Sequence, residues 1–317
     1  MADFEEAMAV QKINENTWVG RRPLGLPLPG ARGVYGGHLV AQGLLVAMEL
    51  APGHIPHSFH IHFIKAGLAQ TPITYTVTRL REGSFAQRQI VALQKGKTVF
   101  SAMCSLFQKG QRANSLELSP QPPLLAQKYP DPDALRNVVH TDFVHNAYLD
   151  EFVDPSLCPE EDKMAPSERQ ITLWCKLHHS GPLKDPRFNF VGLGDLSDAA
   201  VLTTLARALH LDWNPTLDNP YEAYDDLKDA RRLMEVSLNI IHIHHYMAMS
   251  LDHTLYFHVD DFDDFKVMDW LTMSYQFGIS KNHRTLVRGH FFDPKGNCVA
   301  TFVQEGLTYM RPGVNKL

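Results

Sequence analysis

The sequence lacks the features that mark disulfide-linked, membrane-spanning and secreted proteins. Only four cysteines occur in 317 residues, and none forms a C-x-x-C pair. This usage favours free thiols in a reducing compartment. No apolar run approaches the roughly 18 to 20 residues of a membrane-spanning helix. The N-terminal stretch "MADFEEAMAVQKINENTW" carries acids early and has no apolar signal core. We therefore expect a soluble protein without a membrane span.

Several catalytic and nucleotide-binding signatures are also missing. The sequence contains no G-x-S-x-G, no G-x-x-x-x-G-K-[ST] and no H-E-x-x-H. The serine of "REGSFAQ" has the wrong glycines around it, and "YGGH" lacks the three-glycine spacing of a dinucleotide-binding loop. These absences argue against a nucleophile-elbow hydrolase, a P-loop enzyme, a zincin-type metalloprotease and an NAD enzyme. We expect no metal and no organic cofactor.

The overall charge is modest. A formal net charge of −5 and a pI near 6.4 argue against a nucleic-acid-binding surface. They leave room for a local basic pocket that would hold an anionic ligand. A hydrophobic content of 44% and a charged content of 21% are typical of a globular protein.

Two parts of the sequence share one layout. Residues 57–108 and 253–308 both alternate polar and apolar residues with a period of two, as half-buried strands do. Gly96 in "QKGK" and Gly296 in "DPKGN" mark matching turns. The identity between the two segments is faint, so the shared layout is what indicates an internal repeat.

A helix-like run rich in small residues precedes each strand group, at residues 33–51 and 192–209. Between the two halves, residues 109–165 are rich in proline and acids, which is typical of a linker with room for short helices. The pattern predicts an α+β protein with an N-terminal domain at 1–108 and a C-terminal domain at 166–317. Each domain would contain a buried helix and a run of antiparallel strands.

Five short motifs follow one another along the chain. They are "VYGGHLVAQGL" (34–44), "HSFHIHFIKAG" (57–67), "LSDAAVL" (196–202), "SLDHTLYFH" (250–258) and "CVATFVQEGL" (298–307). In this order they resemble the type-II acyl-CoA thioesterases, a family that includes bacterial acyl-CoA thioesterase II and peroxisomal long-chain enzymes. The resemblance implies a double hotdog fold, with two antiparallel sheets each wrapped round a central helix. It also implies an enzyme that hydrolyses fatty acyl-CoA to free fatty acid and CoA.

The resemblance implies a catalytic trio of Asp198, Ser250 and Gln304, which would bind and orient the attacking water. The chemistry is reasonable for these residue types, because a thioester is already activated and water needs a proton acceptor and groups that hold it. We expect Asp198 to lie near the start of a buried helix. Free backbone N–H groups around residues 194–198 would then hold the developing oxyanion.

The first-half motif departs from the family at His38, where the residue after the two glycines is commonly Gln. His38, its neighbour Gly37 and His253 are candidate substrate-binding residues. The repeat alignment places Cys104 opposite Gln304, so we expect one active site per chain, in the C-terminal half.

Cationic side chains are needed for the CoA phosphates. The candidates are Arg284 and Arg288 in "KNHRTLVRGH" and Arg79, Arg81 and Arg88 in the first half.

Three other functions remain open at this point. The H-x-H pairs His242/His244 and His60/His62 have a metal-ligand spacing, so a metal-dependent hydrolase is one alternative. A hotdog enoyl-CoA hydratase would carry His five residues after its Asp, whereas Thr203 occupies that place after Asp198. A non-catalytic acyl-CoA binder is the third.

The sequence ends in "NKL", which matches the peroxisomal S-K-L address in its last two residues. Together with the family resemblance, this predicts a peroxisomal protein that an import receptor would recognise, with the cytoplasm as the alternative. The expected partners are an acyl-CoA substrate and further copies of the chain, as a homodimer or larger homo-oligomer.

Overall fold

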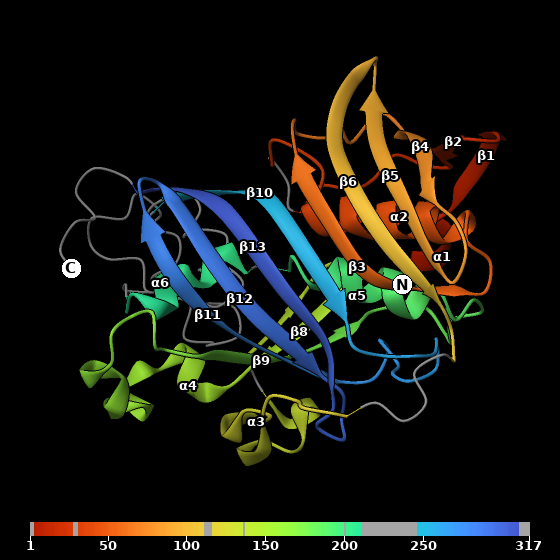
Figure 1. The fold of residues 1–317 in the computed structure, drawn as a ribbon. Coiled ribbons are helices and arrows are strands. Elements are labelled where there is room, and N and C mark those ends of the chain that lie inside the picture. Colours follow the sequence, from red (N-terminus) through yellow and green to blue (C-terminus); the bar gives the residue numbers. More distant parts are fainter. Residues whose placement is uncertain are drawn as a thin grey trace.

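The protein is built on one continuous antiparallel sheet (Figure 1). The computed structural model describes residues 3–27, 31–110, 116–135, 137–199, 201–210 and 246–310. In this part of the chain the strand order is β1-β2-β4-β5-β6-β3-β10-β13-β12-β11-β9-β8-β7. The strands are β1 (Val10–Asn14), β2 (Thr17–Gly20), β3 (His54–Phe63), β4 (Thr74–Arg81), β5 (Phe85–Gln94), β6 (Lys97–Gln108), β7 (Asn137–His140), β8 (Val144–Tyr148), β9 (Ile171–Leu177), β10 (Tyr246–Phe257), β11 (Leu271–Lys281), β12 (Arg284–Phe292) and β13 (Cys298–Met310).

Two longer helices, α2 (Gly36–Glu49) and α5 (Phe188–Leu196), accompany the sheet. The shorter helices are α1 (Phe4–Met8), α3 (Leu124–Lys128), α4 (Asp150–Val153), α6 (Leu205–Ala208) and the 3₁₀ turns η1 (Pro132–Ala134), η2 (Pro155–Leu157), η3 (Pro159–Lys163) and η4 (Leu202–Thr204). None of the helices in the described part of the chain is long and apolar enough to cross a membrane.

The two halves repeat the predicted layout. In the first half, Lys95 and Gly96 both have positive φ, and they connect β5 to β6 through a two-residue turn whose twist suits a hairpin. In the second half, Gly296 (φ 87°) lies in the turn between β12 and β13, which is the matching connection. β5 alternates exposed or half-buried residues with buried ones along its whole length, as its sequence pattern predicts.

The second helix differs from its predicted range of 192–209. α5 begins at Phe188, just after Pro186, and the Asp185 side chain accepts the Arg187 N–H at its start. It ends at Leu196, where the Ser197 hydroxyl donates to a carbonyl of the last turn and so competes with helix continuation. The later part of the predicted range forms only the short η4 and α6.

The segment expected to be a linker, residues 109–165, also contributes to the sheet. β7 pairs with β8, and β8 pairs with β9, so both strands extend the C-terminal half at its outer edge. The proline-rich composition gave no signal of these two short strands. β7 is stabilised by its hairpin pairing with β8, and β8 also by pairing with β9 further along the chain. The division into domains at 1–108 and 166–317 stays a prediction.

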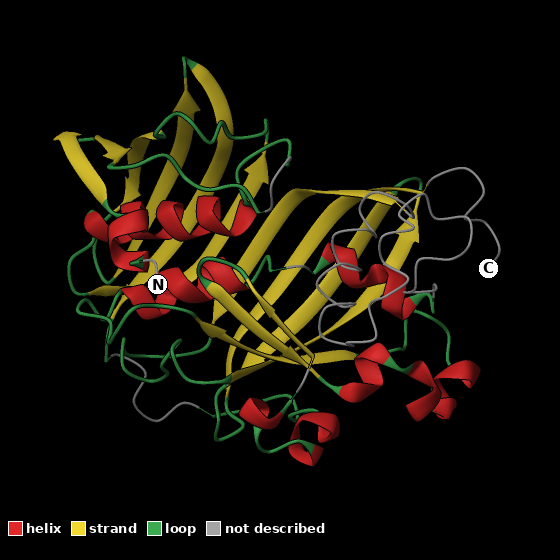
Figure 2. Cartoon of the chain, turned by 180° about the vertical axis from the view of Figure 1, so that it is seen from behind, coloured by secondary structure: helices red, strands yellow, loops and turns green. Residues whose placement is uncertain are grey.

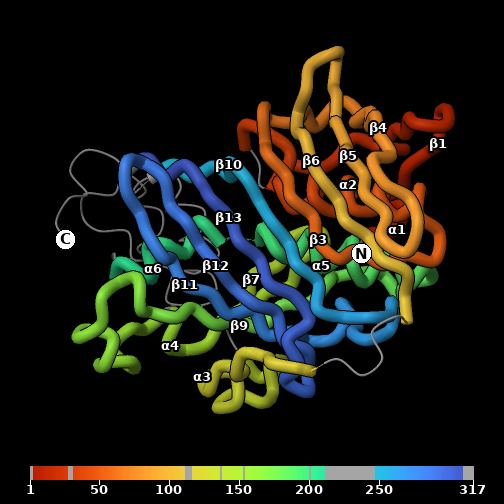
Figure 3. Tube along the Cα trace, in the orientation of Figure 1, coloured from red at the N-terminus to blue at the C-terminus, as the bar shows by residue number. Residues whose placement is uncertain are grey.

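The two halves join at the centre of the sheet. β3 and β10 lie far apart in the sequence but run side by side as an antiparallel pair (Figure 3). Figure 2 shows α2 and α5 next to each other on one face of the sheet. Small residues allow their close approach: a Cβ atom at Gly194 would lie 2.7 Å from Leu44 Cδ1. The main hydrophobic core surrounds this helix pair.

Candidate active site

Three polar side chains from distant parts of the sequence meet in the C-terminal half. Ser250 Oγ donates to Asp198 Oδ1 over 3.0 Å, and Gln304 Nε2 donates to the same oxygen over 2.5 Å. Gln304 Nε2 also lies 2.7 Å from Ser250 Oγ, so the three side chains form a closed ring of hydrogen bonds. The structure thus brings the three predicted residues to one place, while their chemical role stays a prediction.

Asp198 lies at a helix end, but not at the expected kind of end. It follows the C-terminus of α5, and the helix N-terminus beside it belongs to α2. The Gly37 N–H donates a hydrogen bond to the Asp198 carboxylate. A Cβ atom at Gly36 would lie 2.4 Å from Asp198 Oδ2 and would clash with it. This close approach of the backbone to the carboxylate therefore requires glycine at position 36.

The prediction that N–H groups around residues 194–198 would hold an oxyanion is therefore wrong. These residues end a helix, and a helix C-terminus presents carbonyl oxygens rather than free N–H groups. The helix N–H groups near Asp198 belong to the first turn of α2, in the other half of the molecule, and one of them, the Gly37 N–H, donates to its carboxylate.

Neighbouring strands position Ser250 and Gln304. Ser250 lies at an irregularity of β10, where the register against β13 shifts between Ser250 and Asp252. β13 alternates buried and half-buried residues, and Gln304 occupies a fully buried, inward position. A buried amide in an apolar strand needs hydrogen-bond partners, and Asp198 and Ser250 provide them for its Nε2.

The carboxyl group of Asp198 has a perturbed pKa. Burial raises this pKa to about 6, and the hydrogen bonds from Gln304 and Ser250 oppose the rise. The negative charge of Asp195 adds a further increase. Part of the Asp198 surface remains open. A partly accessible carboxylate with a pKa close to neutrality is suited to accept a proton from a reacting group.

His253 lies directly behind the trio. It pairs with Gln304 across β10 and β13, and its Nε2 lies 2.8 Å from the Ser197 hydroxyl. Burial lowers the pKa of His253 to about 3, against a smaller opposing effect of the Gln304 side chain. His253 is therefore a neutral group that packs against Gln304, and its fully buried side chain has no surface for contact with substrate.

His38 takes part in a contact that the sequence analysis missed. Its Nδ1 lies 2.6 Å from Oδ1 of Asp195, which is fully buried in α5. The hydroxyl of Tyr35 donates to the backbone carbonyl of Asp195 over 2.8 Å. The one signal in the sequence was that Asp195 precedes Asp198 by one helical turn in "GLGDLSDAA"; nothing there indicated a partner from the first half.

The candidate CoA-binding arginines of the second half do not join the site. Arg284 and Arg288 alternate along β12 with buried residues and therefore face outward. Val287, which pairs with Gln304, is buried and faces inward. Arg284 forms a 3.7 Å ion pair with the partly exposed Glu305. Both arginines thus lie on the face of the sheet opposite to Gln304.

Of the two H-x-H pairs, His242 and His244 lie outside the described residues. His60 Nδ1 lies 3.3 Å from Thr254 Oγ1, and its ring packs edge-on against Tyr256 on the outer face of the sheet. His62 is exposed two residues further along the strand.

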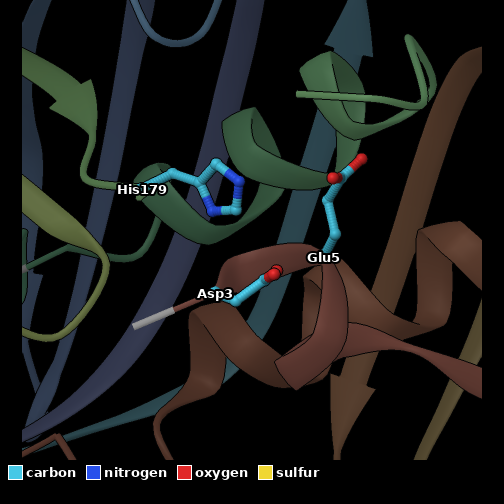
Figure 4. A group of neighbouring side chains, drawn as sticks. All are labelled: Asp3, Glu5 and His179. Carbon is cyan, nitrogen blue, oxygen red and sulfur yellow. The ribbon is translucent and has the colours of Figure 1, made fainter. Parts of the chain in front are cut away.

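In the described part of the chain, the group of potential metal ligands that does come together is Asp3, Glu5 and His179 (Figure 4). Each of these three side chains already accepts a hydrogen bond from a backbone N–H group. His179 Nδ1 accepts the Phe4 N–H, Asp3 Oδ1 caps the start of α1, and Glu5 Oε1 accepts the N–H groups of Lys184 and Asp185. These contacts fasten α1 to the segment before α5, which is a structural role.

Comparisons with known proteins identify the family of this chain. The family model "Acyl-CoA thioesterase C-terminal domain" matches residues 123–308, and "Acyl-CoA thioesterase N-terminal domain" matches residues 26–107. Peroxisomal acyl-coenzyme A thioester hydrolase 1 of Saccharomyces cerevisiae is 27% identical and covers 96% of this chain and 94% of the relative. Acyl-CoA thioesterase 2 of Haemophilus influenzae is 27% identical and covers 88% of each.

Solved structures show the same fold. An acyl-CoA thioesterase II from Mycobacterium marinum has a TM-score of 0.66 at 23% identity, over 98% of each chain. A protein with a hot dog fold from Alicyclobacillus acidocaldarius has a TM-score of 0.61 at 13% identity, over 97% of this chain and 98% of the other. The fold is the double hotdog, and the matching family models show that this chain belongs to the acyl-CoA thioesterase family.

Proposed function

We propose that the protein hydrolyses fatty acyl-CoA thioesters with a water molecule that Asp198, Ser250 and Gln304 bind and activate. The observation that carries this proposal is the closed hydrogen-bonded ring of these three side chains at the N-terminus of α2. The proposed reaction uses no metal, because a thioester is already activated toward attack by water.

In the proposed mechanism, the water oxygen attacks the thioester carbonyl carbon and its proton passes to the Asp198 carboxylate. The carbonyl oxygen becomes an oxyanion, held by N–H groups of the first turn of α2. When the oxyanion reforms the carbonyl, the C–S bond breaks and the thiolate of CoA leaves. The proton on Asp198 then goes to this thiolate, which regenerates the carboxylate.

The pKa of Asp198 supports this role. At about 6, it leaves the carboxylate ionised at neutral pH and basic enough to accept a proton in the transition state. Ser250 and Gln304 hold the ionised form in one orientation, since their donors point at the same carboxylate oxygen.

Apolar side chains beside the site support a fatty acyl substrate. A Cβ atom at Gly36 would contact the ring of Phe63 at 3.5 Å, and one at Gly306 would lie 2.2 Å from Leu202 Cδ1. The two relatives named above are acyl-CoA thioesterases by name. An acyl chain in contact with such residues would gain affinity by removing its own surface from water.

An isotope experiment tests the role of Asp198 as a base. A single turnover of acyl-CoA with excess enzyme in H₂¹⁸O should place the label in the fatty acid and leave the peptide that contains Asp198 unlabelled. Label in the Asp198 carboxylate would show instead that this residue attacks the thioester as a nucleophile, and would overturn the mechanism. Absence of CoA release with every acyl-CoA offered would overturn the function itself.

We further propose a peroxisomal location. The support is the likeness of Asn315–Leu317 to the S-K-L address and the peroxisomal name of the Saccharomyces relative; residues 315–317 lie outside the described residues. A fluorescent protein fused to the N-terminus should colocalise with a peroxisomal marker, and removal of Lys316 and Leu317 should disperse it. Diffuse fluorescence of the intact fusion would favour the cytoplasm.

A homodimer or larger homo-oligomer is also part of this proposal, by family resemblance. Light scattering of the purified protein would test it, and a monomer mass at micromolar concentration would contradict it.

A further inference from the structure

We propose that His38 and Asp195 form a charge-compensating pair that sets the pH range in which Asp198 can act. His38 is thus a positioning residue that acts through Asp195 on the base. The inference rests on the proposed role of Asp198.

The pair lies inside the contact between the two helices. His38 belongs to the first turn of α2, and Asp195 belongs to the last turn of α5. Their closest atoms, Nδ1 and Oδ1, are 2.6 Å apart, and the two side chains are 9% and 0% exposed. The rings of Tyr35 and Phe143 enclose the imidazole edge-on, at centroid distances of 4.9 and 5.7 Å.

Asp195 needs this partner, because a buried carboxylate without a compensating charge is costly. Its Oδ2 atom is buried and has no hydrogen-bond partner in the described part of the chain. The side-chain contact found for its other oxygen is with His38. An imidazole has two ring nitrogens, and one that donates from Nδ1 to a carboxylate and holds a further proton on Nε2 would neutralise it.

Asp195 is electrostatically linked to Asp198. The two residues are separated by one helical turn, and the charge of Asp195 raises the pKa of Asp198. A proton on His38 offsets that charge and therefore favours the ionised form of Asp198. The first half of the molecule would in this way control the base of the second.

The other titratable groups around this point are neutral in the working range. The pKa of Tyr35, before α2, is raised well above 10 by burial and by Asp195 and Asp198. Burial also raises the pKa values of Tyr148 on β8 and Cys175 on β9. Burial lowers the pKa of His253 on β10 to about 3.

Glu49 at the end of α2 and Arg187 at the start of α5 also carry charge. They form an ion pair with each other, at the end of the helix pair away from Asp198. Among the described residues next to Asp198, the His38–Asp195 pair is therefore the one in which an imidazole faces a carboxylate.

The test is the pH dependence of kcat/KM for three variants. His38→Gln keeps a hydrogen-bond donor for Asp195 but removes the titratable group, so the acid limb should move to higher pH by about half a unit to one unit. Asp195→Asn removes the charge, so the limb should move to lower pH by a similar amount. In the double variant the limb should follow Asp195→Asn, since His38 acts only through Asp195.

A matched control is His179→Gln, which makes the same change at another buried histidine, beside α1. It should leave the limb in place even if it lowers the melting temperature. A folded fraction that is constant over the pH range does not move the limb, and circular dichroism at the same pH values checks that each variant stays folded through it.

A limb that stays at the wild-type pH in His38→Gln and Asp195→Asn, or that moves in the opposite direction in either, overturns the inference. Failure of the proposed function looks different: Asp198→Asn would then retain hydrolysis, whatever the pH profile of the His38 and Asp195 variants.

Discussion

The two ends of the α2–α5 helix pair are built differently although the two halves share one layout. At one end, the N-terminus of α2 and the C-terminus of α5 hold Asp198 beside Ser250 and Gln304. At the other end, Arg187 and Glu49 close the helix pair with a 2.9 Å ion pair. One end is a polar, partly open site, and the other, called here the sealed end, is bridged by an ion pair whose side chains are 30% and 34% exposed.

The strands of the two halves carry the same irregularity. β10 shifts its register against β13 between Ser250 and Asp252. β3 shifts its register against β6 between Pro56 and Ser58, at the corresponding place in the first half. The register shift at Ser250 therefore has a counterpart in the first half, but Pro56, which occupies the corresponding position, has no hydroxyl group.

The paired residues next to this irregularity differ in the same way. Gln304 pairs with His253 in the second half, whereas Cys104 pairs with Phe59 in the first. Both residues of the first-half pair are buried, and burial raises the pKa of the Cys104 thiol. The first half thus has an apolar pair where the second has two polar side chains.

A buried arginine completes the sealed end. Arg88 is 1% exposed, and its Nη2 donates to the Leu50 carbonyl just after α2 and to the Glu82 carboxylate. Its Nη1 donates to the Arg81 carbonyl. Arg88 therefore stabilises the fold and is not free for CoA phosphates. One scaffold thus retains its backbone geometry twice, while only the second copy carries the polar side chains that we propose to be catalytic.

The largest expected effect is on the base. Asp198→Asn should lower kcat roughly 10²- to 10⁴-fold, because the amide cannot accept the proton from water. The measurement is CoA release detected with a thiol reagent. Asp185→Asn, at the opposite end of α5 where Asp185 binds Arg187, is the matched control and should turn over at nearly the wild-type rate. Equal losses in both variants would remove the distinction between the two ends.

Arg88→Met should have the next largest effect, on stability rather than on rate. It leaves buried carbonyl groups without donors, so the free energy of unfolding should fall by about 2–4 kcal/mol. Denaturant unfolding measures this change, and the folded variant should keep its kcat within about twofold. The half-exposed Arg79 on neighbouring β4 is the control, since Arg79→Met should cost less than about 0.5 kcal/mol. A large loss of kcat in Arg88→Met would contradict this expectation and show that the sealed end takes part in the reaction.

Ser250→Ala and Gln304→Ala should each lower kcat roughly 10- to 100-fold, because the water and the carboxylate lose part of their orientation. Ser250→Thr keeps the hydroxyl and should remain close to wild type. Cys104→Ala alters the position that corresponds to Gln304 and should change kcat less than about twofold. Steady-state kinetics at saturating acyl-CoA decide between these outcomes, and a strong effect of Cys104→Ala would point to a second site.

The smallest effect is the pH-dependent stability of Asp198→Asn. The folded-state pKa of Asp198 is raised to about 6, so the wild type loses stability as the pH rises through this value. Above about pH 6.5 the variant should be more stable by about 1–3 kcal/mol, toward the lower figure because Asp198 is partly exposed. Below about pH 4 the advantage should vanish. Urea unfolding at several pH values measures it, and a constant difference at all pH values would contradict the raised pKa.

Much of the fold could be predicted because its signals are local. The alternation along β5 and β6 and the turn at Gly96 follow from neighbouring residues. The limits of α5 were harder to predict, because its end depends on the Ser197 side chain competing for a backbone carbonyl. β7 and β8 were missed, since their pairing with each other, and of β8 with β9, stabilises them as strands.

The sequence by itself determined the repeated α+β layout, because alternation and turn positions are local, and the resemblance of its motifs to a known family pointed to Asp198, Ser250 and Gln304 as candidates. Only the tertiary structure decided that Asp198 lies at the N-terminus of α2 and that His38 contacts Asp195. It also decided that Arg88 fills the opposite end, while Arg284 and Arg288 face away from the site. The physical reason is that helix packing and strand register between distant segments set these contacts, and no local pattern specifies them.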